Sequence, residues 1–141
     1  MKILIAIDGS KYGERAADYV ARHFEVLGKS PQQIHLIYVQ PPLPPHAASH
    51  LKRGDADAYY ADEAGKALAP AKAGMASAGM QCTDSFVVGD PAEQLAAAAE
   101  KGGYDMLVMG SHGHGLFTSV ALGSTVTKVL SACKVPLLII R

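Results

Sequence analysis

Two glycine-rich segments late in the chain have the composition of phosphate-binding loops. The first is Gly110-Ser111-His112-Gly113-His114-Gly115, and the second is Gly123-Ser124-Thr125. Glycine lets the backbone adopt positive φ and approach a ligand closely, and successive amide groups can form a concave anion site. The second segment opens a predicted helix, whose free N–H groups and positive dipole end favour phosphate. Together the segments predict an anion site, although Gly123-Ser124 alone could be only a turn and an N-cap.

Two common nucleotide motifs are excluded. The chain has no Gly-Lys-Ser/Thr sequence, which a Walker phosphate-binding loop requires. The dinucleotide fingerprint G-x-G-x-x-G is also missing, because the first predicted strand is followed by Asp8-Gly9-Ser10 and the late loop has the spacing G-x-x-G-x-G.

The elements that must position these loops alternate between strands and helices. Buried, β-branched runs predict strands at residues 2–7, 34–39, 82–88, 106–109 and 135–140. Helical spacing and capping signals predict a first helix from Ser10 to about Leu27, which Gly28 stops. Further helices are predicted at 55–78, 91–101 and 124–132, and Pro70 is expected to kink or interrupt the first of these three. The alternation predicts one α/β domain over residues 1–141, with a five-stranded parallel sheet of order 3-2-1-4-5 and helices on both faces.

The arrangement of strands and helices leaves one proline-rich stretch unassigned and indicates where a ligand would bind. No helix or central strand can run through the prolines of residues 41–45, so we expect a mobile excursion from there to about Gly54. Ligands of such sheets bind beyond the carboxyl ends of the strands, where the strand order reverses. Asp8 after the first strand and residues 110–115 after the fourth would therefore flank one crevice. Asp8 at a strand end is commonly a turn or capping residue, but this location also makes it a candidate for ligand contact.

The glycine spacing resembles a known family. The pattern Gly110-x2-Gly113-x9-Gly123-Ser124 is similar to the one found in the ATP-binding universal stress proteins. The resemblance extends over the whole chain through the phrases at residues 5–10, 88–91, 105–113 and 135–139. It implies a five-stranded parallel sheet, bound ATP or AMP, and a homodimer, which would form through the last strand, Val135 to Ile140, at the predicted sheet edge.

The resemblance also implies roles for individual residues. Ala6 and Asp8 would lie by the adenosine, and Val39 would contact the adenine. The ribose and phosphates would be held by Met109, Gly110, Ser111, His112, Gly113, His114, Gly115, Gly123, Ser124 and Thr125. This chain departs from the family because residues 116–122 carry no charge. The phosphate charge must then be met by backbone amides, hydroxyls, His112 or His114, or a metal ion such as Mg²⁺.

Composition narrows the function classes. Thirteen basic residues balance thirteen acidic ones, which argues against a nucleic-acid partner because such a protein needs a basic surface. No apolar run approaches the length of a membrane span, and Cys82 and Cys133 show no metal-ligand spacing. We therefore expect a cytoplasmic protein without a metal centre.

Three functional hypotheses remain. The first is a nucleotide-binding protein with a regulatory role in stress response, acting on an unknown partner and without assigned catalytic residues. The alternative is a slow ATPase, or an enzyme that phosphorylates itself at Ser124 or Thr125. The third is an interaction module that has lost its ligand, which the glycine pattern disfavours. No general base in the sequence separates the first hypothesis from the second.

Overall fold

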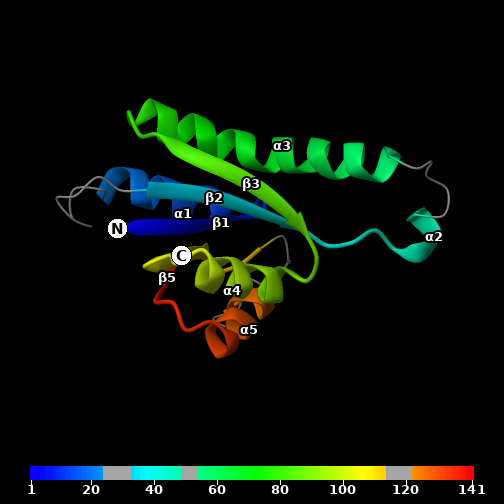
Figure 1. Cartoon of the computed structure of the whole chain (residues 1–141). Helices are drawn as coiled ribbons and strands as arrows, with labels where there is room; N and C mark the ends of the chain where they lie inside the picture. The colour runs from blue at the N-terminus through cyan, green and yellow to red at the C-terminus, as the bar shows by residue number, and fades with distance from the viewer. Residues whose placement is uncertain (24–32, 49–53, 114–121) are drawn as a thin grey trace.

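The protein is an α/β domain with a fully parallel sheet. The structure, a computed structural model, describes residues 1–23, 33–48, 54–113 and 122–141. The elements in chain order are β1 (Lys2–Ile7), α1 (Lys11–His23), β2 (Gln33–Gln40), α2 (Pro45–Ala48), α3 (Asp55–Ser77), β3 (Cys82–Val88), α4 (Pro91–Lys101), β4 (Met106–Gly110), α5 (Ser124–Ala132) and β5 (Leu137–Ile140). The sheet order β3-β2-β1-β4-β5 confirms the predicted fold (Figure 1).

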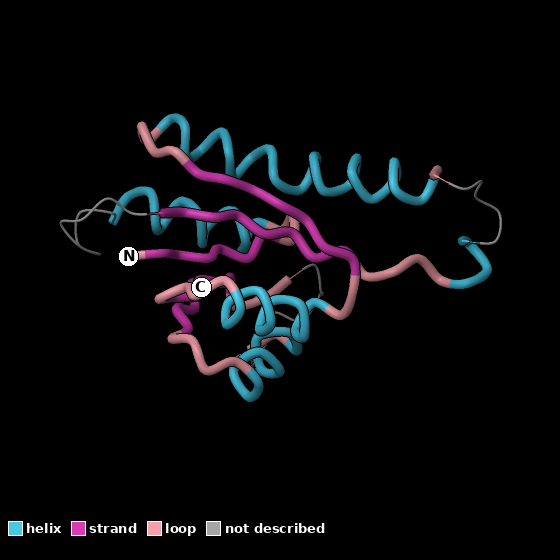
Figure 2. The backbone as a smooth tube through the Cα atoms, in the orientation of Figure 1, coloured by secondary structure: helices cyan, strands magenta, loops and turns pink. Residues whose placement is uncertain are grey.

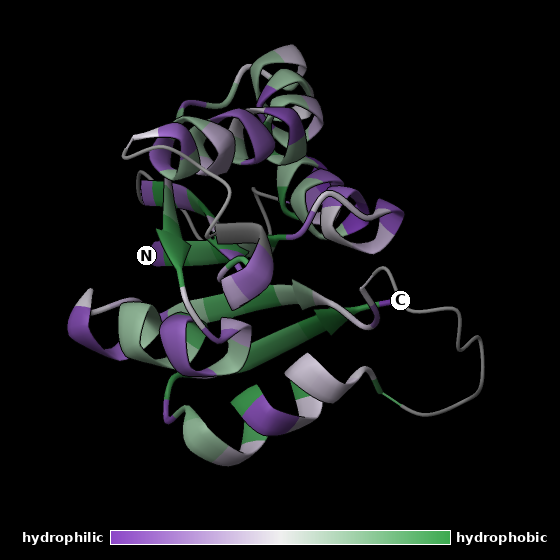
Figure 3. Ribbon diagram, turned by 90° about the vertical axis from the view of Figure 1, so that its right-hand side faces the viewer, coloured by the Kyte–Doolittle hydropathy of each residue, from purple (hydrophilic) through white to green (hydrophobic). Residues whose placement is uncertain are grey.

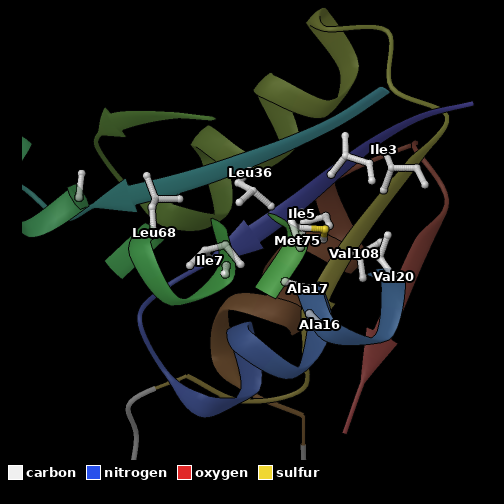
Figure 4. Packing of buried hydrophobic residues seen from close by; sticks show 13 residues of the cluster. Ile3, Ile5, Ile7, Ala16, Ala17, Val20, Leu36, Leu68, Met75 and Val108 are labelled. Atoms are coloured by element: carbon white, nitrogen blue, oxygen red, sulfur yellow. The ribbon is translucent and has the colours of Figure 1, made fainter. Parts of the chain in front are cut away.

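Helices cover both faces of the sheet, with α1 and α3 on one side and α4 and α5 on the other (Figure 1). Alternate residues of β1 enter the two layers: Ile3 and Ile5 pack toward α1 and α3, whereas Leu4 packs toward α4 and α5. Figure 4 shows the first layer, in which residues of β1 meet Val20 of α1 and Met75 of α3. Because both faces of the sheet are covered at its centre, β1 from Ile3 to Ile7 and β4 from Met106 to Met109 are apolar. Figure 3 colours most of the strand ribbon as hydrophobic, whereas the edge strand β3 includes the exposed residues Thr83, Asp84 and Ser85.

The parallel strands place the site at one edge of the sheet. β1 pairs with β2 on one side and with β4 on the other, with Ile5 opposite Leu36 and Val108. The carboxyl ends of all three strands therefore lie at the same edge, where the connections to α1, α2 and α5 begin. Figure 2 shows β1 and β2 running side by side toward this edge.

The start of α4 agrees closely with the sequence. Asp90 is the N-cap, Pro91 is the first helical residue, and one carboxylate oxygen of Asp90 accepts hydrogen bonds from the amides of Ala92 and Glu93, at 3.0 and 3.1 Å. An aspartate N-cap satisfies amides that have no partner within the helix, so the turn Gly89-Asp90-Pro91 determines where α4 begins.

We expect Asp90→Ala to lower the free energy of unfolding by about 1 kcal/mol, because two amides of the first helical turn lose their acceptor. Asp90→Asn is the matched control, since asparagine caps helices about as well as aspartate. Urea denaturation of the three proteins measures the difference. Equal stability of wild type and Asp90→Ala would show that the cap is energetically neutral.

The structure differs from the sequence prediction at several prolines. The proline-rich stretch was expected to exclude helix, but α2 begins at Pro45, because a proline at the first helical position loses no intrahelical bond. α3 continues through Pro70 without interruption, since Leu68, Ala71 and Met75 on one side of it are buried in the core. β5 begins at Leu137 instead of Val135, after Pro136, which has no N–H to donate.

Some of the features predicted from the sequence lie outside the described residues. The predicted continuation of the first helix to Leu27 and its stop at Gly28 lie outside the described residues, as do residues 49–53 of the expected excursion. Within the described parts of the chain, no helix combines the length and apolar character needed to cross a membrane.

Candidate functional site

A cavity of about 670 Å³ lies at the carboxyl ends of β1, β2 and β4. It is bounded on the helix side by the first turns of α4 and α5 and by Gly13 of α1. The volume is within the range of small-molecule sites. The cavity lies between the neighbouring strands β1 and β4. After these two strands the chain crosses to opposite faces of the sheet, and ligands of open parallel sheets bind at such a point.

Ten of the residues predicted from the sequence line this cavity: Ala6, Asp8, Val39, Met109, Gly110, His112, Gly113, Gly123, Ser124 and Thr125. His114 and Gly115 lie outside the described residues. Ser111 is described but is not among the lining residues.

The cavity also contains residues that the sequence did not single out. They are Ile7, Gly13, Tyr38, Pro41, Pro91, Leu95, Leu122 and Val126. Most are apolar and form the wall between β2, α4 and α5. Their contribution depends on how the helices pack on the sheet. The available sequence signals were the position of Pro41 directly after β2 and that of Pro91 at the start of the helix that follows β3.

Asp8 joins three parts of the site. Its Oδ1 accepts hydrogen bonds from the amide and the hydroxyl of Ser10, at 2.9 and 2.6 Å. The Ser10 hydroxyl oxygen in turn accepts the amide of Gly13 at 3.3 Å, which makes Ser10 the N-cap of α1 as the sequence predicts. A Cβ atom added at Gly13 would lie 2.8 Å from Oδ1, and one added at Gly113 would lie 2.8 Å from Oδ2. Asp8 therefore anchors the turn and also borders the glycine loop.

The glycines of the loop serve a different purpose from the one expected. The sequence suggested positive φ at Gly110 and Gly113, but among the described residues positive φ occurs at Gly9, Gly54, Gly79, Gly89 and Gly103. A Cβ atom at Gly110 would lie 2.5 Å from the carbonyl carbon of Tyr12. These two positions are glycine because α1 and the Asp8 carboxylate approach the backbone closely, and not because the backbone is left-handed.

Ser111 connects the glycine loop to neighbouring elements through its backbone. Its side chain is buried, with a residue exposure of 1%. The amide of Ser111 donates to the carbonyl of Ile140 at 2.7 Å, and its carbonyl accepts the amide of Gly123 at 2.9 Å. Ser111 thus fixes the glycine loop to β5 and to the start of α5.

The amino end of α5 opens into the cavity. Its N-cap is Gly123, which provides no side-chain cap, whereas Asp90 caps α4. Ser124 and Thr125 of the first turn line the cavity. Uncapped amides at a helix N-terminus, with hydroxyls beside them, suit an anion.

An aromatic and cationic stack lies next to the loop. The rings of Tyr12 and His112 are 5.2 Å apart, and the guanidinium carbon of Arg15 lies 5.6 Å from the centre of the Tyr12 ring. The Ser111 hydroxyl and Nδ1 of His112 are hydrogen-bonded at 3.0 Å. Arg15 is a positive charge that the sequence analysis missed, although Tyr12 and Arg15 are three residues apart and so share a face of α1.

Tyr38 remains a neutral hydrogen-bonding group at this edge of the sheet. Burial, followed by the charges of Glu63, Tyr59 and Asp8, raises the pKa of the Tyr38 phenol above its ordinary value of 10.0. The phenol is therefore protonated at neutral pH, and it donates to the side chain of Gln40.

Comparison with solved structures relates this arrangement to known proteins. A hypothetical protein of Methanocaldococcus jannaschii, MJ0577, superposes with a TM-score of 0.82 at 25% identity, covering 99% of this chain and 94% of that one. More distant structures carry bound nucleotides. A universal stress protein of Archaeoglobus fulgidus in complex with dAMP has a TM-score of 0.71 at 18% identity, covering 100% of this chain and 98% of that one. An Arabidopsis thaliana family member with AMP bound has a TM-score of 0.68 at 17% identity, covering 99% and 90%.

Comparison of sequences gives the same relationship. A universal stress protein of Thermus aquaticus is 31% identical over 145 residues, which cover 99% of this chain and 97% of that protein. The match to the MJ0577 sequence, also at 31% identity, spans 57% of this chain and about half of that protein. The sequence model of the universal stress protein family matches residues 1–141. The chain therefore belongs to the universal stress protein family.

Proposed function

We propose that this chain binds an adenine nucleotide in the cavity at the carboxyl ends of β1, β2 and β4. The observation that carries the proposal is the convergence of the glycine loop, the uncapped amino end of α5 and a largely apolar wall on one cavity. The apolar wall suits a base, and the two glycine segments suit phosphates. Structures of distant relatives with dAMP and AMP support the same ligand class.

The proposed orientation follows from the lining. Ala6 and Val39 border the base, and Asp8 is placed for the ribose hydroxyls, because a carboxylate accepts hydrogen bonds from them. Gly110, Gly113 and the first turn of α5 border the phosphates. Ser111, His114 and Gly115 are proposed as members of the same phosphate loop.

The test is the identity of any nucleotide released when the purified protein is denatured, followed by calorimetric titration of the stripped protein with ATP, AMP and cyclic AMP. Saturable binding of one of them with one site per chain is expected. No released nucleotide, together with no heat of binding for any of the three, would contradict the proposal and favour an interaction module.

Mg²⁺ has a limited place in this proposal. Among the described residues, no group of three or more histidine, cysteine or acidic side chains could hold a metal ion. Asp8 is the carboxylate that lines the cavity. Mg²⁺ would therefore be held mainly by the nucleotide's phosphate oxygens and water, as is common for this ion.

The enzymatic alternative uses the same cavity. Ser124 and Thr125 line it at the end proposed for phosphates, so either hydroxyl could accept a phosphoryl group. Incubation with ATP labelled at the γ-phosphate distinguishes the two functions. Binding without turnover leaves the label on ATP, whereas the alternative releases labelled phosphate or transfers it to one of these hydroxyls.

We further propose that the protein forms a homodimer through β5. We also propose that it acts on a regulatory partner in the cytoplasm as part of a stress response. β5 is one edge of the sheet, and its four residues are all apolar. The carbonyls of Pro136 and Ile140 accept amides of β4 and the following residue. In a parallel ladder alternate residues point to opposite neighbours, so Leu137 and Ile139 direct their backbone groups to the free edge, where a second copy could pair.

We expect Ile139→Pro to dissociate this dimer, because proline removes an outward N–H without breaking the ladder to β4. Light scattering at micromolar concentrations should show a dimer for wild type and a monomer for the variant. Val88→Pro, at the opposite edge strand β3, is the matched control and should stay dimeric. A monomeric wild type would contradict the dimer. A dimer lost only in Val88→Pro would place the interface at β3 instead of β5.

A further inference from the structure

A histidine in β2, in the half of the sheet away from β5, is hydrogen-bonded to two hydroxyl side chains. Nδ1 of His35 in β2 lies 2.7 Å from Oγ1 of Thr83, and Nε2 lies 2.7 Å from Oγ of Ser85, both in β3. The parallel register places His35 opposite Thr83 and Ile37 opposite Ser85, so the imidazole lies between alternate residues of the neighbouring strand. Ser85 and Thr83 are both exposed.

One tautomer of His35 satisfies all three side chains. The Thr83 hydroxyl lies 3.4 Å from the carbonyl oxygen of Ile34 and can donate its single proton there. Thr83 then accepts from His35, with the imidazole proton on Nδ1. Nε2 is then an acceptor, and the Ser85 hydroxyl donates to it. This is the protonation pattern of a nucleophile and its base, with a third group that orients the base.

A second cavity is lined by two of these three residues, His35 and Thr83. It has a volume of about 340 Å³ and is lined by residues at the amino ends of the strands, including Lys2, Gln33, His35, Thr83 and Tyr104. It therefore lies at the edge of the sheet opposite the nucleotide cavity. The Lys2 ammonium donates to the carbonyl of Gly102 at 2.5 Å and lies 4.6 Å from the centre of the Tyr104 ring.

We propose that Ser85 is an activated nucleophile, with His35 as its general base and Thr83 as the positioning residue, and that it accepts acyl groups from small activated carboxylic esters. The Ser85 oxygen forms a bond to the ester carbonyl carbon while its proton passes to Nε2 of His35. The carbon–oxygen bond to the alcohol breaks, and the leaving alcohol takes that proton. In the second step a water molecule gives a proton to Nε2 of His35 while its oxygen bonds to the acyl carbon. The bond from that carbon to the Ser85 oxygen breaks, the Ser85 oxygen takes the proton back from His35, and the carboxylic acid leaves.

The electrostatic surroundings support a neutral base. Burial lowers the pKa of His35 from its ordinary value of 6.5; Asp84 of β3 opposes this shift and Lys2 of β1 adds to it. The Tyr104 ring lies 6.2 Å from the imidazole, and burial raises the pKa of that phenol. Cys82 lines the same cavity, and burial raises the pKa of its thiol above the ordinary value. His35 is therefore uncharged and able to accept a proton at pH 7.

The test measures covalent labelling of the intact protein by a fluorophosphonate and by p-nitrophenyl acetate, with the modified residue identified by peptide mass spectrometry. In the fluorophosphonate reaction the serine oxygen bonds to phosphorus and fluoride leaves. We expect labelling at Ser85, its loss in Ser85→Ala, and a rate about a hundredfold lower in His35→Gln, since a general base contributes about 10²–10⁴-fold. Ser131→Ala is the matched control, because Ser131 is an exposed serine bonded to a backbone carbonyl, and it should label like wild type.

The pH profile separates activation from simple exposure. The labelling rate should be constant from pH 8 to about 6.5 and fall below that, as His35 takes up a proton and can no longer accept one from Ser85. Equal rates in wild type and His35→Gln, labelling elsewhere than Ser85, or no labelling of wild type would each overturn the proposal. Nucleotide binding is measured separately, so neither result depends on the other site.

Discussion

We expect Gly113→Val to abolish adenine-nucleotide binding while leaving the protein folded. A Cβ atom at this position would lie 2.8 Å from Oδ2 of Asp8, and the two methyl groups of valine would extend into the cavity. The carboxylate would have to move, and the space proposed for the phosphates would be filled. We expect the affinity to fall about a hundredfold or more, equal to about 2.7 kcal/mol.

Calorimetric titration with ATP and AMP measures this loss, and circular dichroism confirms that the fold is retained. Gly65→Val is the matched control, because Gly65 is an exposed residue of α3 with no atom within 4 Å of an added Cβ. It should bind like wild type. If Gly113→Val bound nucleotide with an affinity within about twofold of wild type, the glycine loop would not be the binding site.

Substitution of Gly110 is expected to change the stability of the protein. We expect Gly110→Ala to lower the free energy of unfolding by about 3 kcal/mol, the upper part of the range for overpacked interiors. An added Cβ atom would lie 2.5 Å from the carbonyl carbon and 2.6 Å from the carbonyl oxygen of Tyr12. These are backbone atoms of α1, so a side-chain rotation cannot relieve the overlap and the helix itself must shift.

Urea denaturation followed by circular dichroism measures the change. Gly74→Ala in α3 is the control with the opposite sign: an added Cβ there meets nothing within 4 Å, and alanine is favoured over glycine in a helix by about 0.5–1 kcal/mol. It should stabilise the protein. Unchanged stability of Gly110→Ala would mean that α1 does not press against the end of β4 as described.

The fold could be predicted from the sequence because each of its signals is local. Continuous apolar runs such as Ile3 to Ile7 indicate strands buried on both faces, and Gly89-Asp90-Pro91 specifies the start of a helix within three residues. The alternation of such strands with helices leaves few topologies, since crossovers between parallel strands are long and right-handed. The glycine spacing then pointed to the strand ends, where the structure places Asp8, Gly113 and Ser124 around one cavity.

Tertiary packing decided what each of these residues does. Gly110 and Gly113 are three residues apart, yet a Cβ atom added at the first would meet the backbone of α1 and one added at the second would meet the Asp8 carboxylate. Ser111 of the same segment is buried and is not among the residues that line the cavity. The contacts between His35 and the hydroxyls of Thr83 and Ser85 span 48 and 50 residues of sequence. No local pattern encodes such contacts, because the register of β3 against β2 and the packing of α1 on the sheet are set by the whole core at once.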